Sequence, residues 1–404
     1  MTALDTVITS MAVLTSVGDT VEEFGAALRD GRGGVRAVPL PDAARVTVAA
    51  FLPDSAESPE RVLTGLATRP TRAAVRVARE AVAGAGLGPS ALCRTAVVIG
   101  GNNLALDYQA AAAVRMGCGD GQVQPSHALA HLDIDAVGAV SEATGATAEG
   151  CTIGGSSASG ALALIHACRL LTLDAADHCL VVGALSELST AEYRALTDTG
   201  ALAAGAGMVP ASVCRPFDSS RCGFVHGHGS AAVVVERADT ARARGARQLA
   251  GIAGFAQRLD GKRGTRPSAD GQTATIQAAL RSAGLRPADV DYVNAHATGS
   301  KLGDSTEAES LARTFGDGPL VNATKELTGH CLSGSGVIEA VATVIQLRDG
   351  FCHPNPNLRS PADSRLNYAG PKAVDTPLRV ALSTSFAFSG INTAIVLTRS
   401  VQDD

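Results

Sequence analysis

The 404-residue chain contains no tryptophan and only four tyrosines, and it carries no excess of basic residues. Its 34 lysines and arginines stand against 39 aspartates and glutamates, which gives a formal net charge of −5. Nucleic-acid-binding domains normally present a basic face, so we expect no nucleic-acid partner. With 46% apolar and 18% charged residues, the chain is long enough to bury one large core or two.

The sequence also lacks paired cysteine motifs and long apolar runs. Its nine cysteines form no C-x-x-C pair, and their number is odd. No secretory leader is recognisable at the N-terminus, so we expect a cytoplasmic protein with reduced thiols. The apolar run that starts at Ala161 is interrupted by His166 and Arg169, which makes it too short to span a membrane.

A turn of small residues occupies positions 154–160, near the middle of the chain, and includes Ser157. The apolar run behind it is typical of a buried helix. Free N–H groups and the positive end of the dipole at a helix N-terminus suit a residue that holds an acyl group and its oxyanion. The same pattern also fits a serine that only caps a core helix.

Apolar segments of strand length alternate with helical segments along the chain. We expect strands at 6–15, 95–100, 179–183, 229–235, 379–383 and 392–397, two more that lead into 294–296 and 324–325, and helices at 21–28, 70–86, 128–143, 273–283, 307–315 and 337–347. Continuous apolar strands indicate burial on both faces, and the alternation predicts an α/β fold. The charged stretch 236–247 resembles a surface connection, and it divides the chain into halves of residues 1–240 and 241–404.

Four motifs resemble those of the β-ketoacyl synthase family, the condensing enzymes of fatty-acid and polyketide assembly. Residues 296–307 (HATGSKLGDSTE) are similar to H-G-T-G-T-x-x-G-D-x-x-E, and residues 324–330 (TKELTGH) to T-K-x-x-x-G-H. Residues 386–392 (FAFSGIN) are similar to F-G-F-G-G-x-N, and residues 216–225 (PFDSSRCGFV) to P-F-D-x-x-R-x-G-F-V. The resemblance covers almost the whole chain and implies the thiolase fold, in which two related halves form α/β/α/β/α layers.

The resemblance also assigns catalytic positions. The two catalytic histidines of the family fall on His296 and His330, the structural lysine on Lys325 and the buried glutamate on Glu307. By this assignment the first half carries the nucleophile turn and the second half carries the histidines.

Further positions are assigned to the oxyanion hole and to substrate binding. Phe388 falls on the gating phenylalanine, whose backbone N–H joins that of Ser157 in the oxyanion hole. Phe386, Thr298 and Ser300 lie in the same motifs, and we assign them to the substrate site.

One departure from the family bears on the chemistry. The family places a cysteine where T-A-C-x-S-G enters the helix, and counting back from Ser159 and Gly160 puts Ser157 at that position, with Cys151 six residues upstream. A thiol at a helix N-terminus is partly ionised, whereas a hydroxyl is not and needs a positioned base. An oxygen ester is also a poorer electrophile than a thioester, so condensation from acyl-Ser157 should be slower.

Three interpretations follow. In the first, Ser157 is activated by His296 or His330, takes an acyl group, and passes it on by condensation or transfer, which makes the chain an acyltransferase. In the second, the chain is a non-condensing partner subunit like the chain-length factors of two-component polyketide synthases. In the third, it decarboxylates a malonyl-carrier thioester with the two histidines alone. Because His296 and His330 are both retained, the sequence favours an enzyme, with the first interpretation ahead of the third.

The resemblance further implies the partners. The acyl donor would be a phosphopantetheine thioester on an acyl carrier protein, and the chain would form a homodimer or a heterodimer with a cysteine-bearing ketosynthase paralogue. Acyl transfer and proton handling need no bound cofactor, so we expect none. The pair His226 and His228 has the spacing of metal ligands, but no third ligand lies nearby in sequence, and we expect no metal.

Overall fold

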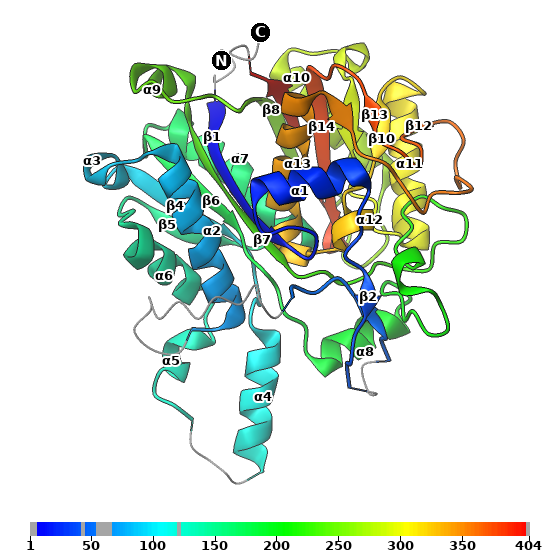
Figure 1. Ribbon diagram of the computed structural model, residues 1–404, viewed down its shortest axis with the longest axis horizontal. Helices are drawn as coiled ribbons and strands as arrows, with labels where there is room; N and C mark the ends of the chain where they lie inside the picture. Colours follow the sequence, from blue (N-terminus) through cyan, green and yellow to red (C-terminus); the bar gives the residue numbers. More distant parts are fainter. Residues whose placement is uncertain (1–5, 42–44, 54–66, 119–122, 401–404) are drawn as a thin grey trace.

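An eleven-stranded mixed sheet runs through the molecule (Figure 1). The computed structural model describes residues 6–41, 45–53, 67–118 and 123–400. Half of the sheet has the strand order β5-β4-β6-β7-β1. Its strands are β1 (Thr6–Thr15), β4 (Thr95–Gly100), β5 (Gly150–Ile153), β6 (His178–Gly183) and β7 (Gly229–Arg237).

The other half repeats this arrangement. Its order is β10-β9-β14-β15-β8, with β12 (Asn367–Tyr368) outside β10. The strands are β8 (Ala250–Leu259), β9 (Tyr292–Asn294), β10 (Leu320–Asn322), β14 (Val380–Ala387) and β15 (Ile391–Arg399).

The strand directions of the two halves correspond one to one. In the first half β4 is parallel to β5 and β6, and β6, β7 and β1 then alternate in direction. In the second half β9 is parallel to β10 and β14, and β14, β15 and β8 alternate in the same way. A short antiparallel contact between β1 and β8 joins the halves. The two related halves expected from the sequence are therefore present.

Helices form three layers around the two half-sheets. Helices α7 (Ser159–Thr172) and α13 (Ser335–Asp349) pack against each other between the half-sheets, α7 on β4 and β6 and α13 on β7 and β14. Helices α2 (Arg69–Ala85) and α6 (Ile134–Thr144) cover the outside of the first half, and α10 (Ala269–Ala283) and α11 (Lys301–Phe315) that of the second. This is the α/β/α/β/α layering that was expected.

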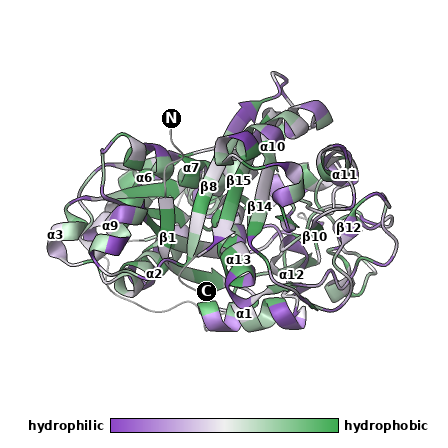
Figure 2. Ribbon diagram, turned by 90° about the horizontal axis from the view of Figure 1, so that it is seen from above, coloured by the Kyte–Doolittle hydropathy of each residue, from purple (hydrophilic) through white to green (hydrophobic). Residues whose placement is uncertain are grey.

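The strand sequences explain this layering. Along β4, Ala96 and Val98 join the core around α7 and α13, whereas Val97 and Ile99 join the core around α2. Successive side chains of a strand point to opposite faces, so a continuous apolar strand is buried on both. Figure 2 shows apolar residues along β1, β8 and β15 and polar residues on the outer helices.

The remaining elements connect these layers. They are α1 (Val21–Asp30), α3 (Pro89–Leu92), α4 (Leu106–Gly117), α5 (His127–Ala130), α8 (Thr190–Asp198), α9 (Ala238–Ala243), α12 (Lys325–Thr328), β2 (Arg36–Ala37), β3 (Val48–Ala49), β11 (Phe351–Cys352) and β13 (Val374–Asp375). Helix α4 extends from the body of the molecule (Figure 1). No helix in the described ranges is long and apolar enough to cross a membrane.

The crossing of α7 and α13 depends on two glycines. A Cβ atom on Gly160 would lie 2.8 Å from the backbone nitrogen of Val337, and one on Gly336 would lie 2.4 Å from that of Ala161. These distances leave no room for a side chain, so the helices approach at backbone contact. Each helix follows directly from a 3₁₀ turn that borders the cavity described below, Ser156–Ala158 before α7 and Leu332–Gly334 before α13. The crossing therefore sets the distance between those two turns.

The structure corrects two sequence expectations about helices and connections. The helix expected over 128–143 is divided into α5 and α6, and between them the carboxylate of Asp133 accepts hydrogen bonds from the N–H groups of Asn103 and Leu104. The stretch 236–247 is not simply a surface connection. Glu236 is buried at the end of β7, where it accepts hydrogen bonds from Thr9 and Arg244.

Other boundaries also differ from expectation. The strand expected to lead into 324–325 ends at Asn322, and Lys325 begins α12. Several elements were not expected, and the longest of them are α4, α8 and β8. The division between residues 240 and 241 falls inside α9 and stays a prediction.

Candidate active site

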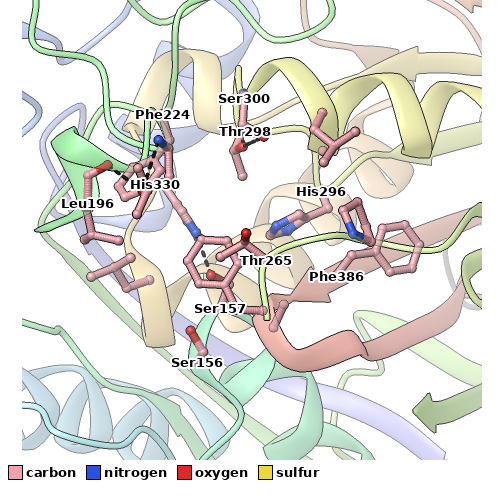
Figure 3. A pocket seen from close by; sticks show the side chains of 18 of the residues that line it. Ser156, Ser157, Leu196, Phe224, Thr265, His296, Thr298, Ser300, His330 and Phe386 are labelled. Atoms are coloured by element: carbon pink, nitrogen blue, oxygen red, sulfur yellow. Dashed lines mark hydrogen bonds between the residues drawn. The ribbon is translucent and has the colours of Figure 1, made fainter. Parts of the chain in front are cut away.

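A cavity of about 650 Å³ lies where the two halves meet, and eight of the nine predicted site residues line it. The wall combines the turn before α7, the loop between β9 and α11, the turn before α13 and the end of β14. Figure 3 shows the side chains of Ser157, His296 and His330 converging on this space. Lys325 is the exception and lies behind the wall.

The turn that carries Ser157 is held by several hydrogen bonds. Ser156 adopts a φ of 51°, which is uncommon for a residue with a side chain. Its N–H donates to Oδ1 of Asn102 at 3.1 Å, and the N–H of Gly155 donates to Oγ of Ser159 at 2.9 Å. Ser159 in turn donates to the carbonyl of Ser156 at 2.7 Å. These contacts fix the backbone on both sides of Ser157, which is half-buried at the cavity wall.

His330 contacts Ser157 directly. Its Nε2 lies 2.8 Å from Ser157 Oγ, and its Nδ1 lies 3.0 Å from the hydroxyl of Ser335. The backbone N–H of His330 donates to the carbonyl of Val225 at 2.7 Å, which anchors the residue to the first half of the chain. Burial, with the nearby charge of Lys325, lowers the pKa of His330 well below 6.5. His330 is therefore a neutral imidazole at pH 7.

His296 lies beside His330, with the ring centroids 5.6 Å apart and the rings nearly perpendicular. Burial is the main cause that lowers its pKa well below 6.5, and the charge of Lys325 adds to it. Among the described residues, Nδ1 of His296 has no hydrogen-bond partner. Two imidazoles with lowered pKa values thus border the cavity beside the hydroxyl of Ser157.

Two buried carboxylates shape the loop that carries His296. Glu307 accepts hydrogen bonds from the N–H groups of His296 and Ala297, at 2.8 and 2.7 Å, and from Thr384 Oγ1 at 2.8 Å. Burial raises the pKa of Glu307 to about 7, although these hydrogen bonds favour the charged form and act to lower it. Asp304 accepts from the N–H groups of Thr298 and Gly299. Both carboxylates position the loop through its backbone.

Lys325 pairs with Glu339 of α13, and both side chains are almost completely buried. A buried ion pair that loses one member leaves an uncompensated charge, so the pair constrains how α12 and α13 pack. The Lys325 charge also disfavours protonation of either histidine.

The residues assigned to substrate binding surround the histidines. Phe386 is buried with its ring edge-on to His296 at 6.3 Å, whereas Phe388 is 42% exposed at the cavity wall. Thr298 donates a hydrogen bond to Ser300 Oγ at 3.1 Å. The roles assigned to these residues, including the oxyanion hole of Ser157 and Phe388, stay predictions.

Polar residues that support the site and were not expected include Asn102, Ser335 and Glu339. Asn102 holds the turn that carries Ser157, Ser335 contacts the far nitrogen of His330, and Glu339 neutralises Lys325. The sequence offered a signal for Glu339, because it is an acidic residue within the apolar run 337–347. Asn102 and Ser335 lie in segments without a matched motif.

The histidine pair with metal-ligand spacing has other partners. His226 Nδ1 lies 2.6 Å from the hydroxyl of Tyr193, and His228 stacks on Phe51 at 3.9 Å. Within the described ranges, no group of three or more His, Cys, Asp or Glu residues could hold a metal ion. Of the cysteines, Cys222 borders the cavity, and burial raises the pKa of its thiol. Cys151 is half-buried on β5.

Comparisons with known proteins agree with this architecture. Residues 5–241 match the beta-ketoacyl synthase N-terminal domain, and residues 249–359 match the C-terminal domain. The polyketide biosynthesis malonyl-ACP decarboxylase PksF of Bacillus subtilis (strain 168) is 34% identical over 400 residues, which are 97% of this chain and 96% of that protein.

Two solved structures are similar over nearly the whole chain. A beta-ketoacyl synthase from Burkholderia phymatum STM815 has a TM-score of 0.91 at 30% identity, and the ishigamide ketosynthase/chain length factor has 0.90 at 27%. Each match covers 98% of this chain and 100% of the other. The predicted thiolase fold is confirmed.

Proposed function

Because the chain belongs to the β-ketoacyl synthase family, we propose that it decarboxylates a malonyl group carried as a thioester on an acyl carrier protein. This is the third interpretation that the sequence left open. The observation that carries it is the hydrogen bonding of His330: Nε2 contacts Ser157 Oγ, and Nδ1 faces the hydroxyl of Ser335 where a general base would need a carboxylate.

Decarboxylation needs hydrogen-bond donors more than it needs a nucleophile. When the carboxylate leaves as CO₂, the bonding electrons pass into an enolate whose negative charge rests on the thioester oxygen. Preorganised donors that point at this oxygen in a water-poor site stabilise the transition state. His296 and His330 border one cavity side by side, and each neutral ring carries one N–H for this purpose.

Acyl transfer to Ser157 would need more from His330. A serine hydroxyl reacts when a histidine takes its proton, and in the Ser-His-Asp arrangement a carboxylate stabilises the imidazolium that forms. Here the second nitrogen of His330 meets the hydroxyl of Ser335, and Lys325 disfavours a second positive charge. His330 is thus better suited to donate a hydrogen bond than to act as a base.

Acyl transfer remains the second candidate because of the 2.8 Å contact between Ser157 Oγ and His330 Nε2. A stable acyl-Ser157 would identify it. The partner-subunit interpretation draws on the likeness to the ishigamide ketosynthase/chain length factor, and it predicts a protein without turnover of its own.

The proposal includes the assembly in which the enzyme works. The substrate arrives on the phosphopantetheine of an acyl carrier protein, and the reaction uses no resident cofactor. We also propose a dimer, with a second copy or with a cysteine-bearing paralogue. In its support, β5 is an edge strand of the sheet, and the α4–α6 region, of which α6 packs on β5, exposes the apolar side chains of Val114, Met116, Leu129, Leu132 and Ile134.

Turnover of malonyl-carrier protein without any second acyl substrate tests the proposal. We expect acetyl-carrier protein and CO₂ in equal amounts, and a loss of turnover of about 10²–10³-fold when either histidine donor is removed as His296→Ala or His330→Ala. Because the pKa of both histidines is lowered, we expect no loss of turnover as the pH falls from 8 to 6.5. Malonyl-carrier protein that stays intact would overturn the proposal.

A further inference from the structure

We propose that the hydroxyl of Ser157 delivers the proton that converts the enolate into the acetyl product, so that the residue at the nucleophile position is a general acid. This inference rests on the proposed decarboxylation. A condensing enzyme joins the enolate carbon to an acyl group, but a decarboxylase must protonate that carbon. The structure has to supply a proton donor at the place where the condensing enzyme holds its acyl group.

Ser157 occupies that place. It lies on the cavity wall with Oγ 2.8 Å from His330 Nε2, and His296 borders the same space (Figure 3). If the N–H groups of His296 and His330 hold the thioester oxygen, His330 shares its single N–H between that oxygen and Ser157 Oγ, and the neighbouring α carbon lies over the Ser157 hydroxyl. Side chains that transfer protons act within hydrogen-bond reach of the reacting atom, which this placement satisfies.

The hydrogen bonds around His330 can leave the Ser157 proton free. With the ring proton on Nε2, His330 donates to Ser157 Oγ, and Nδ1 accepts the proton of Ser335, 3.0 Å away. In this arrangement the hydroxyl hydrogen of Ser157 points away from His330 and into the cavity. Ser335 is then a positioning residue that selects the tautomer.

The step balances with water as the source of the proton. The bond between Cα and the carboxyl carbon breaks and its electrons form the enolate. A new C–H bond then forms at Cα as the Ser157 O–H bond breaks. A thioester enolate is a stronger base than an alkoxide, so this transfer is downhill. The alkoxide, held by the N–H of His330, recovers a proton from water in the cavity, so that acetyl thioester, CO₂ and hydroxide leave the site, and the hydroxide is neutralised in bulk solvent.

This role accounts for the serine. A thiol at the start of α7 would be partly ionised, and a thiolate carries no proton to give. It would also attack the thioester. A serine hydroxyl stays protonated throughout the working pH range, and His330 without a carboxylate is too weak a base to remove its proton. The substitution thus suppresses acylation and retains a proton donor.

Return of labelled CO₂ into the substrate tests the inference. Malonyl-carrier protein is turned over under ¹³CO₂, and the mass of the unreacted substrate is measured by mass spectrometry. In the wild type, we expect the enolate to be protonated faster than CO₂ adds back to it, so that no ¹³C enters the malonyl group. In Ser157→Ala, we expect the enolate to persist, label to enter the malonyl group, a solvent deuterium isotope effect to appear, and product formation to fall about 10²–10⁴-fold.

Ser157→Thr is the matched control, because it keeps a hydroxyl, and we expect wild-type labelling from it. Ser157→Gly repeats the removal in case the alanine variant misfolds. Unlabelled substrate and wild-type turnover in both hydroxyl-free variants would overturn the inference while leaving decarboxylation intact. A wild-type enzyme that releases no CO₂ would instead overturn the proposed function.

Discussion

At the scale of single residues, the site depends on burial more than on ion pairs. Lys325 with Glu339 is the exception, since the histidines and Glu307 are held by backbone and hydroxyl contacts. Glu326, next to Lys325, is also buried, and its Oε2 has no hydrogen-bond partner among the described residues. Burial raises the pKa of Glu326 to about 8 from an ordinary 4.5. The folded protein therefore holds a proton on Glu326 at neutral pH.

This raised pKa predicts a pH-dependent stability. Between pH 4.5 and about 8 the unfolded chain has lost the Glu326 proton while the folded chain keeps it, so unfolding becomes easier as the pH rises. The slope in this window is about 1.4 kcal/mol per pH unit. Glu326→Gln removes the titration and retains the oxygen that accepts the N–H of Asn357. In urea unfolding, we expect the glutamine variant to gain stability relative to wild type from pH 5.5 to 8.5.

A difference between the two proteins that stays constant over this pH range would contradict the assignment. Other groups titrate in both proteins, so their contributions cancel in the comparison.

At the scale of elements, the α7–α13 crossing connects the fold to the chemistry. Ser157 lies in the turn before α7, and His330 lies just ahead of the turn that leads into α13. Their 2.8 Å contact thus depends on how closely the helices cross at Gly160 and Gly336.

Gly336→Ala tests this dependence. The added Cβ would lie 2.4 Å from the backbone nitrogen of Ala161, so the helices must separate. We expect a loss of about 1–3 kcal/mol in the free energy of unfolding and a fall in turnover at unchanged pH profile. Gly138→Ala on α6 is the matched control, because its Cβ would meet no atom within 4 Å, and we expect it to stabilise by about 0.4–1 kcal/mol. Equal effects of the two variants on turnover would count against the crossing.

At the scale of the whole molecule, continuous apolar runs predicted the buried strands well. Residues 6–15 and 95–100 match β1 and β4 in full, since strands buried on both faces leave a strong pattern. Strand β8 was missed because its second half is partly exposed and mixes polar with apolar residues. The helix over 128–143 was expected too long, since the break between α5 and α6, where Asp133 bonds to a distant loop, leaves no mark in the periodicity.

The candidate site was predictable where a motif kept its residues together. Ser157, His296 and His330 come from three separate segments, and the family resemblance assigned all three to one site. The sequence did not predict Asn102 and Ser335, because no matched motif contains them. Asn102, for example, is 54 residues from its partner Ser156 in sequence. Such contacts exist only once the chain is folded.

The most direct test of the central claim is the mass of the intact enzyme, quenched while it turns over malonyl-carrier protein. We predict acetyl-carrier protein in the mixture and an unmodified enzyme, because Ser157 gives a proton and takes no acyl group. An acetyl or malonyl adduct that disappears in Ser157→Ala, but persists in Cys222→Ser, would contradict the account and establish Ser157 as a nucleophile.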